Sequence, residues 1–105
     1  MFRRGLATAR MRTFGAMADS DVFVVSFART PIASVGSKLS AITAPYLGSH
    51  AVKAALSKVP SFPKEKIQEA FMGNVLSAGL GQAPSRQAIL YAGLDKDTPC
   101  TTGKF

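Results

Sequence analysis

Residues 70–94, AFMGNVLSAGLGQAPSRQAILYAGL, contain the strongest structural pattern in the chain. The apolar run 70–76 predicts a strand, and Gly73 inside it indicates a bulge or a close backbone approach. The glycines and the proline that follow predict a turn. Pro84 then begins a helix over 84–92 that Gly93 caps, because proline suits a first helical turn and glycine suits the residue after the last one. The stretch therefore predicts a strand, a turn and a helix in direct succession.

Further strands and a further helix are predicted on both sides of this stretch. Residues 21–28, DVFVVSFA, are mostly β-branched and aromatic, which predicts a strand buried on both faces. Residues 43–59 carry apolar side chains with a 3.6-residue period, with Thr43 as N-cap and Pro45 in the first turn, and they predict a helix. Residues 99–102 begin a third strand.

The order along the chain is strand, helix, strand, helix, strand. This alternation predicts an α/β fold with a parallel sheet and right-handed crossovers. A short charged turn at 64–68 separates the first helix from the second strand. We assign residues 19–105 to this one domain.

The N-terminal residues 1–18 form a separate basic segment. The chain has a net charge of +7, and this segment contributes +4 through Arg3, Arg4, Arg10 and Arg12, with no acidic residue. An arginine-rich, acid-free start is typical of a mitochondrial presequence, which predicts location in the mitochondrial matrix. Two alternatives are an unstructured basic start without a role and a nucleic-acid-binding arm. The arm lacks an accompanying basic and aromatic surface in the rest of the chain, so we expect no nucleic-acid partner.

Composition excludes several classes of protein. At 105 residues and 47% hydrophobic content, the chain is too apolar to be a disordered tail. No apolar run approaches the roughly 20 residues of a membrane-spanning helix. Cys100 is the only cysteine, and only His50 could join it as a nitrogen or sulfur ligand, so the sequence predicts neither a disulfide nor a metal site.

Four features could carry chemistry, and each has a simpler structural interpretation. Gly79-Leu80-Gly81 lacks the third glycine of a dinucleotide-binding loop and the Gly-Lys-Ser/Thr of a phosphate loop, which favours turn glycines. Glu65 and Glu69 are four residues apart with no apolar pocket around them, which favours a solvated face. His50 lies off the apolar stripe of its helix and is expected in solvent. Cys100 precedes no helix in this chain and is expected to be a small buried strand residue.

Several stretches together resemble the thiolase family. VVSFARTPIASVGSKLS resembles the first strand and loop of thiolases, V-x-x-ARTP-I-G-x-F-G-G-x-L, and residues 44–56 occupy the place of their first helix. FMGNVLSAGLGQAPSRQAILYAGL resembles their MGNVLQAGxGQNPARQAALxAGL, and TPCTT resembles the start of their third strand. The match covers about residues 21–102, and acetyl-CoA acetyltransferases with a mitochondrial presequence are the most similar group within the family.

The resemblance implies the N-terminal part of a thiolase domain and the family's acyl-transfer chemistry. One cysteine thiolate takes an acyl group from acyl-CoA, and a second cysteine abstracts a proton from another acetyl-CoA. The resulting enolate attacks the thioester while oxyanion holes hold the developing charge, and thiolysis is the reverse reaction. The family also implies a homo-oligomer and coenzyme A thioesters as substrates.

The resemblance also decides the interpretation of Cys100. In thiolases the third strand continues as T-T-x-N-K-x-C, and the final cysteine is the nucleophile. Cys100 matches the residue before the two threonines, and Thr102 is followed by Gly103-Lys104-Phe105. The resemblance therefore assigns no catalytic, cofactor-binding or metal residue to this chain, and we expect it to be inactive alone. A splice form, a frameshift and an incomplete gene model all remain open as the origin of this ending.

Two further expectations concern the chain as a separate polypeptide. A domain of this size buries only about 60% of its unfolded-chain surface, and its central strands would become edges, so we expect marginal stability and aggregation. The alternative to an enzyme part is a short isoform that acts as an interaction or inhibitory module for a full-length thiolase subunit.

Overall fold

The computed structural model describes residues 20–104, and the segment 1–18 assigned to a presequence lies outside them. The described part contains two α-helices, a short 3₁₀ helix and two strands. In chain order they are α1 (Ala44–Ser57), η1 (Lys64–Lys66), β1 (Ala70–Gly73), α2 (Pro84–Tyr91) and β2 (Cys100–Gly103). The two helices and the last two strands confirm the predicted elements, with the strand 70–76 shorter than expected.

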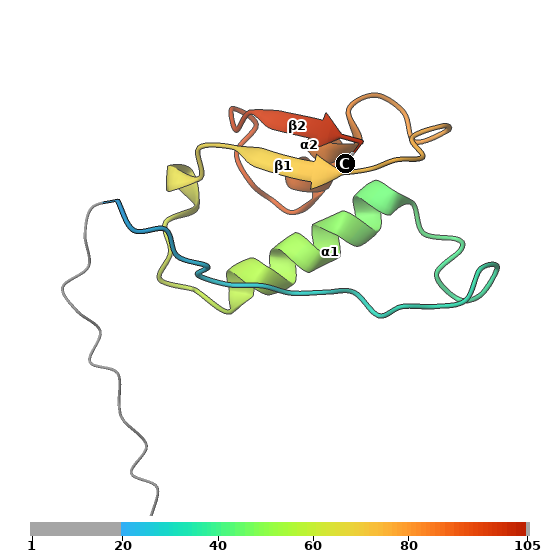
Figure 1. Cartoon of the computed structure of the whole chain (residues 1–105), viewed down its shortest axis with the longest axis horizontal. Coiled ribbons are helices and arrows are strands. Elements are labelled where there is room, and N and C mark those ends of the chain that lie inside the picture. The colour runs from blue at the N-terminus through green and yellow to red at the C-terminus, as the bar shows by residue number, and fades with distance from the viewer. Residues whose placement is uncertain (1–19, 105) are drawn as a thin grey trace, which may run out of the picture.

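The two strands form a parallel pair, and α2 is the crossover between them (Figure 1). Ala70 pairs with Cys100 at one end and Gly73 with Gly103 at the other. Two hydrogen bonds extend the ladder, from the Ala70 amide to the Pro99 carbonyl at 2.9 Å and from the Asn74 amide to the Gly103 carbonyl at 2.8 Å. The predicted α/β class with a parallel sheet is confirmed.

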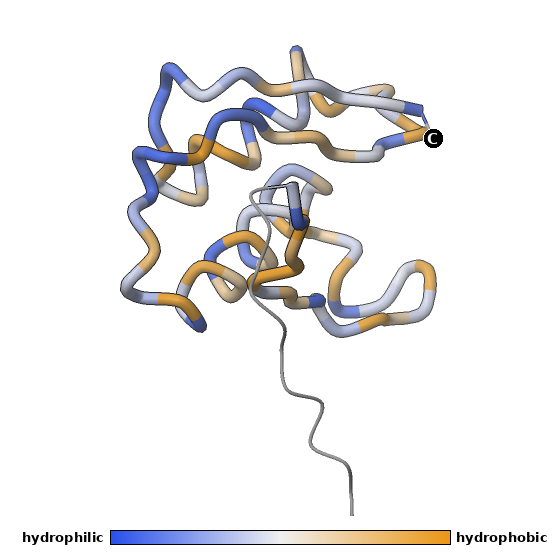
Figure 2. Tube along the Cα trace, turned by 60° about the vertical axis from the view of Figure 1, so that its left-hand side comes forward, coloured by the Kyte–Doolittle hydropathy of each residue, from blue (hydrophilic) through white to orange (hydrophobic). Residues whose placement is uncertain are grey.

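The predicted first strand, 21–28, is not formed. Instead, this segment runs alongside α1 (Figure 1), where the Ser26 hydroxyl donates to the Ala55 carbonyl at 2.7 Å. Lys58 donates to the Phe27 carbonyl at 2.8 Å and lies over the Phe27 ring. A strand needs a second backbone to pair with, and among the described residues β1 and β2 pair only with each other. Residues 22–25 of the segment are all hydrophobic (Figure 2) and stay exposed, with Val22 95% accessible.

The two helices pack against each other, and α2 packs against both strands, while the Met72 side chain of β1 reaches α1 at Gly48. A Cβ at this position would lie 2.8 Å from Cε of Met72 on β1 and 3.4 Å from Cβ of Ala88 on α2. The absence of a side chain at Gly48 therefore lets α1, α2 and β1 meet. Thr43 is the N-cap residue as predicted, but its side chain makes no capping hydrogen bond.

The core is centred on α2 and the turn that ends it. Gly93 has φ 80° and caps the helix as predicted. The Gly93 amide donates to Leu90 at 3.0 Å and the Leu94 amide donates to Ile89 at 3.3 Å, which is the Schellman pattern. This cap turns Leu94 inward, so that the buried apolar residues of the described chain are Ala88, Ile89, Ala92 and Leu94.

Candidate functional site

The loop between β1 and α2 is held by one side chain of the helix that follows it. Gly79 and Gly81 have φ values of 74° and 78°, so they are turn glycines, as the sequence predicts. Nε2 of Gln87 donates to the Leu80 carbonyl at 2.8 Å and to the Gln82 carbonyl at 2.9 Å. The glycines in this motif therefore shape a loop that Gln87 fastens to α2.

Arg86, the neighbour of Gln87, fastens the turn at the other end of α2. One guanidinium nitrogen donates to the Thr98 carbonyl at 3.1 Å, and the second donates to the Lys96 carbonyl. Thr98 is buried, and its own amide donates to the Asp95 carbonyl at 3.2 Å. Arg86 thus stabilises the turn that immediately precedes β2. Local sequence patterns predict no role for Arg86 or Gln87, and the only signal for them is their adjacency in the Pro-x-Arg-Gln motif.

The start of α2 combines a strained residue with a cap from the sheet. Ala83, the N-cap residue, has φ 48° and ψ 69°, and it is the one described non-glycine residue with positive φ. The Ser85 amide donates to the Thr102 hydroxyl of β2 at 3.2 Å. A side chain from the sheet therefore satisfies a helix amide that an ordinary N-cap side chain would satisfy.

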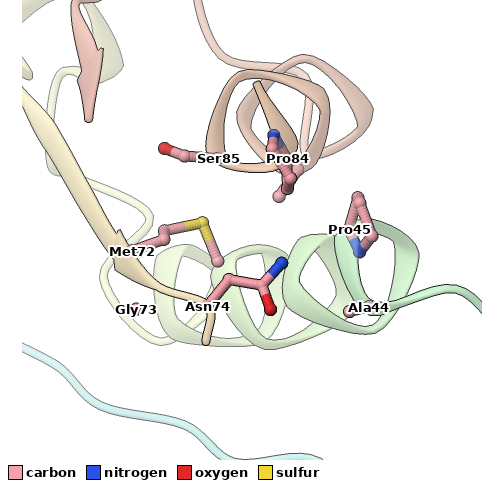
Figure 3. Close-up of a pocket in the computed structure, with 8 residues that line it drawn as sticks. Ala44, Pro45, Met72, Gly73, Asn74, Pro84 and Ser85 are labelled. Atoms are coloured by element: carbon pink, nitrogen blue, oxygen red, sulfur yellow. The ribbon is translucent and has the colours of Figure 1, made fainter. Parts of the chain in front are cut away.

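A small cavity of about 70 Å³ lies where the two helices begin and β1 ends (Figure 3). Ala44 and Pro45 of α1, Met72 and Asn74 at the end of β1, and Pro84 and Ser85 of α2 line it. Ser85 is 1% exposed. Within residues 20–104, the buried side-chain atoms without a hydrogen-bond partner are Nδ2 of Asn74 and Oγ of Ser85, and both residues border this cavity.

Cys100 is the first residue of β2 and is half-buried, close to the buried strand position that was predicted. Its thiol donates to the Thr98 carbonyl at 3.2 Å. A thiolate nucleophile is usually stabilised by a helix amino end or by an imidazole, whereas Cys100 begins a strand. His50 is exposed on α1, where its ring meets the Tyr46 ring edge-on at 5.0 Å, and this agrees with the predicted solvated histidine.

The remaining candidates are also surface residues. Glu65 lies in η1 and Glu69 just before β1, and both are exposed, in agreement with the predicted solvated face. Across the described residues, no three His, Cys, Asp or Glu side chains gather in a way that could hold a metal ion. No helix in that part of the chain is long and apolar enough to cross a membrane.

Comparison with known proteins identifies the family. Residues 22–103 match the family model described as "Thiolase, N-terminal domain". This match covers most of the chain, including both helices, both strands and the loop that Gln87 fastens. The chain therefore belongs to the thiolase family.

Curated relatives place it near one group of enzymes. The mitochondrial acetyl-CoA acetyltransferase of Bos taurus is 53% identical over 83 residues, which are 79% of this chain and 19% of that protein. The Homo sapiens protein of the same name is 54% identical over 82 residues, with 78% and 19% covered. The Danio rerio protein is 52% identical over 83 residues, with 79% and 20% covered. The chain thus spans about one fifth of the length of these relatives, and their mitochondrial naming agrees with the predicted location.

Proposed function

We propose that this chain is the N-terminal part of a mitochondrial acetyl-CoA C-acetyltransferase. The whole enzyme would condense two acetyl-CoA to acetoacetyl-CoA and catalyse the reverse thiolysis through a cysteine acyl-enzyme. The observation that carries this proposal is the family match over residues 22–103, together with 53% identity to a named acetyl-CoA acetyltransferase. Residues 1–18 would direct it to the mitochondrial matrix as a presequence.

In this proposal the chain contributes framework and no catalytic group. Arg86 and Gln87 hold the two turns around α2, and the apolar residues of α2 form a small core. The thiol of Cys100, the first residue of β2, donates a hydrogen bond to the Thr98 carbonyl. Coenzyme A thioesters are substrates of the whole enzyme, and we assign no cofactor-binding, metal or catalytic residue to this chain. Homo-oligomer formation would likewise be a property of the whole enzyme.

A segment exchange tests this proposal directly. Residues 22–103 would replace the matching segment of the Bos taurus relative, and thiolysis of acetoacetyl-CoA would be followed as the loss of substrate. We expect the exchanged enzyme to retain activity because the replaced core and turns are of the same family. The unexchanged enzyme and a version without the segment serve as controls. A soluble, folded exchange protein with no more activity than the version without the segment would contradict the proposal.

The purified 105-residue chain is expected to show no thiolysis. Its matched control is Cys100→Ala, which would leave the assay at the same background. Turnover that the wild-type chain shows and Cys100→Ala abolishes would refute the structural role given to this cysteine.

A second candidate function is an interaction or inhibitory module for a full-length thiolase subunit. It is favoured by the exposed apolar residues of 20–35, where Val24, Ile32 and Val35 are 87%, 97% and 105% accessible. Exposing these apolar side chains to water is unfavourable, and a protein partner that covers them would remove that cost. We expect an affinity-tagged chain to retain a purified full-length acetyl-CoA acetyltransferase if this function holds. Ile32→Lys and Val35→Lys would weaken retention, whereas Lys38→Ala serves as the polar control.

A further inference from the structure

The cavity at the beginning of both helices has polar groups that the framework role leaves unused. It is bordered by Ala44 and Pro45, the first residues of α1, and by Pro84 and Ser85, the first residues of α2. Met72, Gly73 and Asn74 close it at the carboxyl end of β1. Ligands of open α/β sheets generally lie outside the carboxyl ends of the strands, which is the position of this cavity.

Two hydrogen-bond donors at the cavity have no partner among residues 20–104. Nδ2 of Asn74 can only donate, and Oγ of Ser85 can donate or accept. Both atoms are buried without a hydrogen bond, and the Ser85 residue is 1% exposed. In Figure 3 the Asn74 amide nitrogen points toward the space between Pro45 and Pro84, while the Ser85 hydroxyl lies on the side of Met72. Leaving such donors unpaired is costly, so the site favours an occupant that accepts hydrogen bonds.

The charge distribution around the cavity favours a negative occupant. The amino ends of α1 and α2 both border it, and a helix amino end carries a partial positive charge. None of the residues that line it is acidic, so an anion meets no repulsion from the wall. No lining residue is basic either, and binding is therefore expected to be weak. A volume of about 70 Å³ has space for a group of a few heavy atoms.

We propose that this cavity is a binding site for a small carboxylate, such as formate. The carboxylate accepts a hydrogen bond from the Asn74 side-chain amide, and the Ser85 hydroxyl is the second donor that the wall of the cavity offers. All the residues that line the site belong to this chain, so the site exists in the isolated chain.

The experiment uses the full 105-residue chain labelled with ¹⁵N. Asn74 is the only asparagine of the sequence, so its side-chain amide signal is distinguished from those of the glutamines. Formate is titrated at constant ionic strength against chloride, with formamide as a neutral carbonyl control. We expect a saturable shift of the Asn74 side-chain amide with formate and only a small linear change with chloride. Gln68, an exposed amide, is the internal control.

Substitutions then test which groups bind. Ser85→Ala is expected to weaken formate binding by about tenfold, because a hydrogen bond to a charged group is lost. Ser57→Ala, which removes an exposed hydroxyl from α1, should leave it unchanged. If Ser85→Ala fails to fold, the proposal is tested by the wild-type chain alone, through the shifts of the Asn74 side-chain amide signal with formate, chloride and formamide. Equal shifts with formate and chloride, or with formate and formamide, would overturn the proposal, as would a saturable shift at Gln68 in place of Asn74.

Discussion

Ala83 is in a backbone conformation that an asparagine adopts more easily, so Ala83→Asn is expected to stabilise the chain. The residue has φ 48° and ψ 69° immediately before α2. In this left-handed region the Cβ of an ordinary residue approaches the next carbonyl oxygen, at a cost of about 1–2 kcal/mol. Asparagine tolerates the region because its short polar side chain bonds locally. We therefore expect a gain of about 1 kcal/mol in the free energy of unfolding.

Ala83→Gly separates the backbone strain from any effect of the asparagine side chain. Glycine removes the strain but increases the freedom of the unfolded chain, which costs roughly 0.5–1 kcal/mol. The two contributions oppose each other, so the net gain is expected to be about 0.5 kcal/mol. The expected order of stability is asparagine, then glycine, then the wild-type alanine.

The matched control makes the same chemical change where φ is helical. Ala54 is exposed in the last turn of α1. Ala54→Gly should lower the free energy of unfolding by about 1 kcal/mol, because glycine is a poor helix former. Alanine to glycine is thus expected to stabilise at position 83 and to destabilise at position 54.

The assays are urea unfolding and thermal unfolding, both followed by circular dichroism, since the chain has no tryptophan for fluorescence. A change of 1 kcal/mol corresponds to about 4–8 °C in Tm for a domain of this size. If Ala83→Asn were no more stable than the wild type, while Ala54→Gly lost the expected stability, the strain argument at the start of α2 would be wrong.

Three further predictions concern the framework around α2. Arg86→Met should lower the free energy of unfolding by about 1–3 kcal/mol because it removes the guanidinium from the carbonyls of the turn before β2; an unchanged urea midpoint would contradict this. Thr102→Val should cost about 1 kcal/mol by leaving the Ser85 amide without its acceptor, and Thr102→Ser should restore most of it in the same titration. Gly48→Val should lose about 1–3 kcal/mol through overpacking against β1 and α2, and a melting temperature at or above the wild-type value would show that the contact is looser than described.

The sequence determined the elements whose signals are local. A 3.6-residue apolar period with a proline in the first turn predicted α1, and Pro84 with Gly93 predicted both ends of α2. The family was also readable from the sequence, because the FMGNVL stretch and the Gly-Gln-x-Pro-x-Arg-Gln stretch form a long, specific pattern. The structural roles of Cys100, Glu65 and His50 followed from their neighbours in sequence.

The tertiary structure alone decided whatever depends on a distant partner. Residues 21–28 have the composition of a strand, but a strand forms only beside another backbone, and here the segment lies against α1. The Arg86 contacts join residues ten and twelve positions apart, and no local period predicts them. The cavity with Asn74 and Ser85 arises because two helix amino ends and one strand end converge. Secondary-structure propensity depends on short stretches of sequence. Strand pairing, side-chain burial and the loss of hydrogen-bond partners depend on which stretches come together in the folded chain.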